Sequence, residues 1–282
     1  MATQQRATLP LPTLDQETRA SFDVLGVRVN VIQIPEVVKI VKQWVIRRDN
    51  GRYVAVTGMH GVTEAQHDAR FKEILNAADL TVPDGMPLVW LGRLRGFQLK
   101  RRVYGPELML AVCAEVAKTG VRHFFYGATP STLESLTAAL TRRSPNIEIA
   151  GMISPPFRNL TAAEDREFVT QINAARPDIL WIGLSTPKQE RWMYDHRDRL
   201  DVPAMIGVGA AFDIHAGRTK QAPVWMREHG LEWLYRLVHE PRRLWRRYLV
   251  FGSEFVFLVL RDYFRSAAKT RLRKHAASQS KV

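Results

Sequence analysis

The sequence predicts an α/β fold in which helices flank a parallel sheet, followed by a basic helical C-terminal appendage. Short apolar runs alternate with segments of helical periodicity over most of the chain, which is typical of a parallel sheet with helices on both faces. Several runs end in loops rich in Gly, Ser and Thr, as strands do at the carboxyl edge of such a sheet. The final stretch is rich in arginine and aromatic residues, which sets it apart from the body.

Each expected element follows from a local pattern. Residues 35–48 repeat apolar side chains at helical spacing. Thr161 and Glu164 have capping-box spacing at the start of another helix, and Pro130 suits an early helical position. The expected strands cover residues 22–31 (a hairpin), 53–57, 80–82, 122–126, 147–152, 178–182 and 204–208. The expected helices cover 35–48, 63–77, 107–118, 131–142, 161–175 and 188–198, with 58–61 as a loop.

The composition indicates a globular protein without internal disulfides. A chain of 282 residues, 46% of them hydrophobic, suffices for one large domain or two modest ones. The single Cys113 excludes an intramolecular disulfide and is consistent with a reducing compartment. The sequence shows neither a signal-peptide pattern nor an apolar run of membrane-spanning length. We expect a flexible segment (1–20), an α/β domain (21–235) and a basic amphipathic appendage (236–282).

The charge is concentrated near the C-terminus. The formal net charge is +13, which points to an anionic partner such as nucleic acid, phospholipid or a phosphorylated substrate. Residues 236–274 hold eleven Lys and Arg against three acidic residues, so this stretch carries +8 of the total (eleven minus three). The body is therefore only mildly basic.

Three loops occupy equivalent places after predicted strands. They begin at Gly127, Gly183 and Gly207, and the last continues through Gly209 to Asp213. Helix N-termini that follow such loops present free N–H groups and a positive dipole end, which suit phosphate. The alternative is that these are ordinary turns, because Gly, Ser and Thr are common in turns without a ligand.

Five segments, in order, resemble the WecG/TagA/CpsF family of bacterial glycosyltransferases (glycosyltransferase family 26). Together they cover roughly residues 22 to 248 in the order of the family. The segments are Ala78-Asp-Leu-Thr-Val-Pro-Asp-Gly-Met86, Arg102-Val-Tyr-Gly-Pro-Glu-Leu108, Gly183-Leu-Ser-Thr-Pro-Lys-Gln-Glu190, Gly207-Val-Gly-Ala-Ala-Phe-Asp213, and Ala222-Pro-Val-Trp225 with Gly230-Leu-Glu-Trp-Leu-Tyr-Arg236.

The resemblance implies an inverting transfer of a hexose-type sugar from a UDP-sugar to a polyprenyl-diphosphate-linked saccharide, in exopolysaccharide or cell-wall polymer synthesis. It implies no metal and no cofactor. It also implies a Rossmann-like body whose basic appendage docks on the anionic inner face of the cytoplasmic membrane, which makes the protein cytoplasmic and peripheral. Whether the protein forms a homo-oligomer is left open.

Two residues match catalytic positions of the family. Asp84 matches the proposed catalytic Asp, and an inverting displacement needs one base to take the proton of the acceptor hydroxyl. The alternative is a plain Asp-Gly turn at Asp84 and Gly85. Thr57 matches a pocket threonine at the end of another strand, where the alternative is an ordinary strand-end hydroxyl.

Further residues are candidates for binding the substrate. Without a metal, Arg, Lys and backbone N–H groups must neutralise a nucleotide diphosphate. The candidates are Arg102, Gly127, Gly183, Gly209, Asp213, Lys188, Gln189, Glu190, Arg236 and Arg243. The alternatives are a capping Gln/Glu pair for Gln189 and Glu190, and a solvated surface charge for Arg102.

One position departs from the pattern of the family. The family usually has Asn two positions after the Thr, whereas this chain reads Thr57-Gly58-Met59-His60. The 2-substituent of the donor, or the acceptor, is therefore read differently, and N-acetylmannosamine is not carried over as the donor. His60 is a candidate second polar group of the site, or else an exposed loop residue.

The segment 231–265 mixes aromatic residues with arginines. On a helical wheel Leu244, Trp245, Tyr248 and Leu249 share one arc, and Arg242, Arg243, Arg246 and Arg247 share the other. This pattern is typical of a helix that lies on an anionic membrane surface. The alternative is a core-packing helix with a solvated basic face.

Three other functions compete with glycosyl transfer. The charge and the aromatic residues suit nucleic-acid binding, but no nucleic-acid motif is present, so we expect no nucleic-acid partner. A nicotinamide-dependent oxidoreductase is disfavoured because Phe212 stands where the dinucleotide fingerprint has Gly or Ala. A noncatalytic membrane-associated scaffold is the third alternative.

Overall fold

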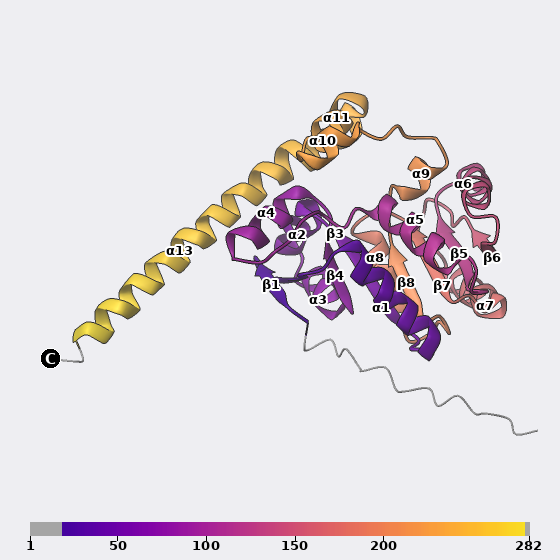
Figure 1. The fold of residues 1–282 in the computed structure, drawn as a ribbon, viewed down its shortest axis with the longest axis horizontal. Coiled ribbons are helices and arrows are strands. Elements are labelled where there is room, and N and C mark those ends of the chain that lie inside the picture. The colour runs from indigo at the N-terminus through magenta and orange to yellow at the C-terminus, as the bar shows by residue number, and fades with distance from the viewer. Residues whose placement is uncertain (1–18, 280–282) are drawn as a thin grey trace, which may run out of the picture.

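The α/β body is built on a six-stranded parallel sheet with the strand order β4-β3-β8-β7-β5-β6 (Figure 1). The computed structural model describes residues 19–279, with side chains up to residue 265. The strands of the sheet are β3 (Arg52–Thr57), β4 (Leu80–Pro83), β5 (Arg122–Gly127), β6 (Glu148–Ile153), β7 (Ile179–Gly183) and β8 (Ala204–Gly207). An antiparallel hairpin of β1 (Ser21–Val24) and β2 (Val27–Asn30) precedes it in the chain. The predicted Rossmann-like class is confirmed.

Helices cover both faces of the sheet because its central strands are apolar on both sides. Val54, Leu180 and Ile206 are fully buried. One core lies under α1 (Ile34–Arg47), α5 (Gly105–Val116), α6 (Pro130–Arg143) and the short α9 (Ala211–His215). The other lies under α2 (Met59–His67), α3 (Ala69–Ala77), α4 (Met86–Leu94), α7 (Ala162–Ala175) and α8 (Lys188–His196).

Side chains cap two of the expected helices, one of them by the predicted capping box. Thr161 and Glu164 form a reciprocal capping box at the start of α7. Thr129 caps α6, since its hydroxyl accepts a hydrogen bond from the N–H of Thr132. These caps hold the ends of the βα loops that face the same edge of the sheet.

The structure differs from the prediction between residues 58 and 94. Residues 59–61 are the first turn of α2, so the expected loop at 58–61 is wrong. The single helix expected over 63–77 is broken at Asp68, whose carboxylate accepts a hydrogen bond from the N–H of Phe71 and starts α3 as a new helix. The helix α4 was not expected, because its sequence is nearly uniformly apolar and has little helical periodicity.

The predicted amphipathic segment is not one continuous helix. It contains α11 (Glu232–His239), α12 (Pro241–Trp245), a π-helical turn η2 (Arg246–Val250) and α13 (Phe251–Gln279), and α10 (Val224–Glu228) precedes it. The expected apolar arc is wrong as a single surface, because Leu244 is buried whereas Trp245 and Leu249 are about half exposed. A π-turn adds a residue to the helical period, which rotates the side chains that follow it.

The start of α13 is attached to the body, and the rest extends away from it (Figure 1). Phe255 and Leu258 are buried, and the first turns of α13 pack against α2. None of the helices within residues 19–279 combines the length and hydropathy needed to cross a bilayer. Most of the flexible segment expected over 1–20 lies outside the described residues, and the division at residue 235 stays a prediction.

Gly183 supports the edge of the sheet where the candidate loops lie, and its replacement tests the packing there. A Cβ at Gly183 would lie 2.6 Å from the ring of Phe212, whose side chain is buried. We expect Gly183→Ala to lower the free energy of unfolding by about 1–3 kcal/mol, because the ring cannot move without displacing the core. Urea denaturation measures the change.

Gly252 provides the matched control for this prediction. It lies in α13, and a Cβ there would meet Met59 at an ordinary contact distance of 3.5 Å. Gly252→Ala should leave stability unchanged or raise it by up to about 1 kcal/mol, because alanine favours the helix. Equal effects at the two positions would contradict the assigned packing.

Candidate active site

Asp84 lies at the carboxyl end of β4, next to the end of β3. Its N–H donates a hydrogen bond to the carbonyl of Thr57 over 2.7 Å, which ties the two strand ends together. A Cβ at Gly58 would lie 2.2 Å from the carbonyl oxygen of Asp84, so this approach requires glycine at position 58. The predicted position of Asp84 at the sheet edge is therefore confirmed.

The carboxylate of Asp84 faces a small cavity of about 120 Å³, which we call the Asp84 cavity. It is lined by the βα loops on one side and by the C-terminal segment on the other. Its lining includes Gly58, His60, Asp84, Met86, Arg102, Tyr104, Thr186, Glu232, Arg236, Arg247 and Tyr248. The cavity therefore lies between the α/β body and the C-terminal segment.

Burial raises the pKa of Asp84 to about 6. The guanidinium of Arg102, whose Nη1 lies 3.9 Å from Oδ1 of Asp84, opposes this effect, and the carboxylate of Glu232 adds to it. Oδ1 of Asp84 has no hydrogen-bond partner within the described residues. A carboxylate with a raised pKa and a free oxygen in a cavity is suited to act as a general base.

Arg102 is held by Glu232 rather than by Asp84. Nη2 of Arg102 donates to Oε2 of Glu232, and the hydroxyl of Tyr104 donates to Oε1 over 2.9 Å. The guanidinium also lies over the ring of Tyr104, 4.0 Å from its centre. Glu232 belongs to α11, so this cluster joins the body to the C-terminal segment.

Two arginines of the C-terminal segment reach the same cavity. Arg236 from α11 and Arg247 from η2 both line it, and each has a buried Nε without a partner in the described part of the chain. Both guanidinium groups lower the pKa of Asp84 electrostatically. They place positive charge near the carboxylate without forming a hydrogen bond to it.

His60 lies in the first turn of α2 and lines the Asp84 cavity, so the alternative of an exposed loop histidine is wrong. Burial, with a smaller contribution from nearby Arg247, lowers its pKa to about 4. The ring is therefore neutral near pH 7, and it packs edge-on against Phe251 of α13. A neutral imidazole can donate a hydrogen bond to a sugar hydroxyl or accept one from it.

Three predicted site residues do not line the Asp84 cavity but hold buried oxygens without partners in the described part of the chain. They are Thr57, Gln189 and Glu190, whose side chains are almost fully buried. The other carboxylate oxygen of Glu190 accepts hydrogen bonds from Thr186 and Gln189, and burial raises the pKa of Glu190. Polar groups buried without partners are costly, so these oxygens are candidates for ligand contact.

A second and larger cavity, of about 450 Å³, lies over the ends of β5, β7 and β8. We call it the loop cavity. Each of its loops contains a residue with positive φ, namely Ala128 (φ 55°), Ser185 (φ 65°) and Gly209 (φ 50°). Loops of this kind can point successive N–H groups at an anion.

The loop cavity also gathers several of the predicted binding residues. Gly183, Lys188, Gly209, Asp213 and Arg243 line it. Arg243 comes from α12, so the C-terminal segment contributes to this cavity too. Burial raises the pKa of Asp213, and Arg243 opposes that shift. Gly127 is absent from the lining, although Ala128 and Thr129 of the same loop belong to it.

Sequence reasoning missed Glu232, Tyr104 and Arg247. Glu232 and Tyr104 both lie in the family segments, but a lone Glu and Tyr there carry no local signal of a shared cluster. Arg247 was assigned to the membrane-facing arc, because a π-turn cannot be read from a helical wheel. Among the described residues, no three His, Cys, Asp or Glu side chains gather as a metal site would require.

Asp84 should lower the stability of the folded protein near neutral pH. Its folded pKa of about 6 lies above the ordinary 3.8, so the folded state binds the proton more tightly between these values. Its contribution to stability is therefore most favourable below pH 3.8 and is lost as pH rises through 6. We expect Asp84→Asn to raise the free energy of unfolding at about pH 7.5 and to raise it less at about pH 4.5.

Urea denaturation at the two pH values measures this effect. Asp262→Asn, at an exposed position of α13, is the control and should change stability by less than about 0.5 kcal/mol at either pH. An Asp84→Asn variant that is less stable than the wild type near pH 7.5 would show that the carboxylate is stabilised, not strained, by its surroundings.

Comparison with known proteins assigns the chain to a family. The model of the glycosyl transferase WecG/TagA/CpsF family matches residues 22–269. This match contains Asp84, the βα loops and most of the C-terminal segment, so it covers every side chain that lines the two cavities.

Relatives with assigned names support the same conclusion. A protein of Bacillus spizizenii is 30% identical over 234 residues, which is 83% of this chain and 88% of the relative. A protein of Bacillus subtilis is 32% identical over 64% of this chain and 69% of its own length, and one of Staphylococcus aureus is 28% identical over 82% and 90%. Each is named an N-acetylglucosaminyldiphosphoundecaprenol N-acetyl-beta-D-mannosaminyltransferase. Motifs, fold and these matches together establish that this chain is a glycosyltransferase of the WecG/TagA/CpsF family.

Proposed function

We propose that this enzyme transfers a hexose-type sugar from a UDP-sugar to a polyprenyl-diphosphate-linked saccharide, with inversion and without a metal ion. The observation that carries the proposal is the position of Asp84, a carboxylate with a raised pKa in a cavity rimmed by arginines. The cavity lies beside the loop cavity, and Thr186 of one adjoins Ser185 of the other.

Asp84 acts as the general base in this proposal. It takes the proton of the acceptor hydroxyl while that oxygen forms a bond to the anomeric carbon of the donor. The bond from that carbon to the diphosphate oxygen breaks on the opposite face, and UDP leaves with the electron pair. A single displacement of this kind inverts the anomeric configuration and needs only one base.

The protein itself neutralises the departing diphosphate. Arg236 and Arg247 bring two positive charges to the Asp84 cavity, and Lys188 and Arg243 bring two more to the loop cavity. Backbone N–H groups of the βα loops add preorganised donors. These groups can supply the positive charge that a metal ion supplies in metal-dependent transferases, and we therefore assign no metal to the reaction.

Recognition of the donor sugar depends in this proposal on His60. The relatives are named as N-acetylmannosaminyltransferases. Here His60 lies in the cavity close to where the family has its Asn, and it has a buried Nδ1 without a partner among the described residues. We propose that His60 contacts the 2-substituent of the donor, which a panel of UDP-sugars tests directly.

Apolar side chains of the C-terminal segment place the enzyme on the inner face of the cytoplasmic membrane in this proposal. Val238, Phe257 and Phe264 are each more than 60% exposed. Arginines of the same segment lie nearby, and this combination favours an anionic lipid surface. The acceptor would be a lipid-linked intermediate of a cell-wall polymer or exopolysaccharide.

Asp84→Asn should abolish transfer without abolishing binding of the nucleotide. We expect kcat to fall at least about 100-fold, because general-base catalysis contributes a factor of that order. In the wild type, kcat/KM should rise with pH and level off above about 6, since only the ionised carboxylate accepts the proton. UDP binding by calorimetry is the control, and a variant with near-normal turnover would remove Asp84 from the mechanism.

Replacing Phe257 and Phe264 by Ser should weaken binding to liposomes that contain anionic lipid. The two side chains are exposed on α13, and loss of their apolar area should lower the bound fraction several-fold in a flotation assay. Phe157→Ser is the matched control, because Phe157 is 87% exposed on the body. Equal flotation of all variants and wild type would exclude this role of α13.

A further inference from the structure

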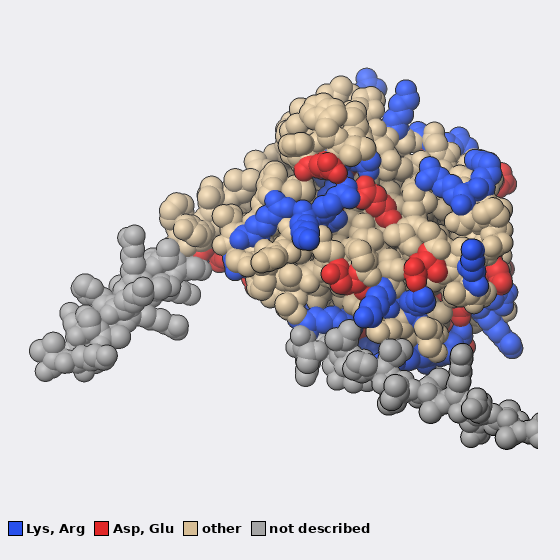
Figure 2. Space-filling model, in the orientation of Figure 1, with Lys and Arg blue, Asp and Glu red and all other residues tan. Residues whose placement is uncertain are grey.

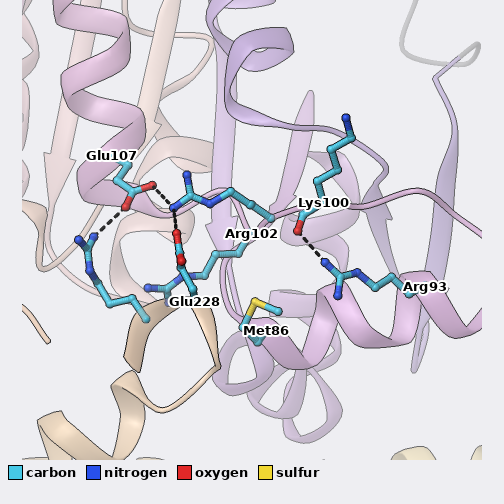
Figure 3. A pocket seen from close by; sticks show the side chains of 8 residues that line it. Met86, Arg93, Lys100, Arg102, Glu107 and Glu228 are labelled. Carbon is cyan, nitrogen blue, oxygen red and sulfur yellow. Dashed lines mark hydrogen bonds and ion pairs between the residues drawn. The ribbon is translucent and has the colours of Figure 1, made fainter. Parts of the chain in front are cut away.

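A third cavity, of about 320 Å³, is lined by Arg102 and by residues of α4, α5 and α10 (Figure 3). We call it the Lys100 cavity. It shares Met86 and Arg102 with the Asp84 cavity, so the two are neighbours. Met86, Arg102 and Glu107 of its lining belong to the family segments, but the proposed mechanism does not use the cavity. Its lining residues come from α4, α5, α10 and the segment between α4 and α5.

The Lys100 cavity carries an excess of positive charge. Arg101 is shared between Glu107 and Glu228, and Arg227 also pairs with Glu107. Arg93 donates only to the carbonyl oxygens of Leu99 and Lys100, so its charge is not neutralised. No acidic partner of the Lys100 ammonium is recorded within residues 19–279.

The excess amounts to two charges. Arg102 is paired with Glu232 and is not counted. The other four cations are Arg93, Lys100, Arg101 and Arg227, and the carboxylates of Glu107 and Glu228 neutralise two of these four charges. A band of Lys and Arg side chains is visible beside α4, below the mostly uncharged surface of α10 and α11 (Figure 2). A diphosphate esterified at both ends carries two negative charges, which matches this excess.

Two helices that supply cations to the cavity also expose large hydrophobic side chains. These are Trp90 and Leu94 on α4 and Val224 and Trp225 on α10, each at least 45% exposed. The chain just beyond α10 lies against α4, because a Cβ at Gly230 would lie 3.0 Å from the ring of Trp90. We take these exposed side chains of α4 and α10 as the apolar rim. A cationic cavity with an apolar rim suits an anionic head group attached to a hydrocarbon chain.

We propose that the Lys100 cavity binds the diphosphate of the polyprenyl-linked acceptor, and that the rim formed by α4 and α10 receives the first isoprene units. This inference rests on the proposed function, which supplies an acceptor of that chemistry. The nucleotide diphosphate and the lipid diphosphate then lie in separate cavities, each of which adjoins the Asp84 cavity. In an inverting displacement the acceptor approaches the anomeric carbon from the face opposite to the leaving group, so two separate anion sites are required.

The positions of the cavities fit the size of the acceptor. In an acceptor with a single sugar, the ring separates the reacting hydroxyl from the diphosphate on the anomeric carbon. Met86 and Arg102 form the wall that the Asp84 and Lys100 cavities share, so the ring would bridge the two across this wall. Arg102 then contacts the acceptor between its diphosphate and its reacting end.

Lys100→Glu tests the assignment without disturbing the ion pairs. We expect the Kd for farnesyl diphosphate, measured by calorimetry, to rise about tenfold or more, because one favourable charge becomes unfavourable. The Kd for UDP should stay within about twofold. Lys118→Glu is the control, because it makes the same charge change at an exposed position just beyond the end of α5. It should alter neither the Kd for farnesyl diphosphate nor the Kd for UDP.

A second variant separates the apolar rim from the charge. Trp225→Ser should weaken binding of farnesyl diphosphate several-fold and leave binding of inorganic pyrophosphate unchanged. The proposal is overturned if the wild type does not bind farnesyl diphosphate, if Lys100→Glu leaves that binding unchanged, or if it weakens UDP binding equally. Failure of the proposed function is distinguishable, because the wild type would then bind both ligands and transfer no sugar.

Discussion

The ion pair between Arg102 and Glu232 is the contact on which the site depends. Both side chains are largely buried, so removing either one would leave an uncompensated charge in the interior. The pair fixes α11 against the body and thereby brings Arg236 and Arg247 over the Asp84 cavity. It also occupies the guanidinium that would otherwise neutralise Asp84, which helps the carboxylate to keep the raised pKa of a base.

The division of charge around Asp84 follows from the parallel sheet. All strands of the sheet end at one edge, so the loops after β5, β7 and β8 converge on one ligand region. β4 is an edge strand of the sheet, so Asp84 at its carboxyl end lies beside that region and not within it. In the proposed reaction, the cations around the carboxylate would let two phosphorylated substrates meet there without sharing a binding site.

Local patterns were sufficient to predict the body but not the site as a whole. The strands and most helices have clear periodicity and caps, and strand-end logic placed Asp84 and Thr57 correctly. The location of His60 in a helix and the start of α4 were missed because neither has a local signal. The partnership of Arg102 with Glu232 spans 130 positions, and no pattern along the chain reports a contact of that separation.

That separation also sets the order in which the enzyme can become active. During synthesis the sheet can fold as soon as β8 has emerged, whereas α11 leaves the ribosome later. Arg102 and Asp84 are therefore made well before Glu232, Arg236 and Arg247, and the Asp84 cavity is complete only once the C-terminal segment has been synthesised.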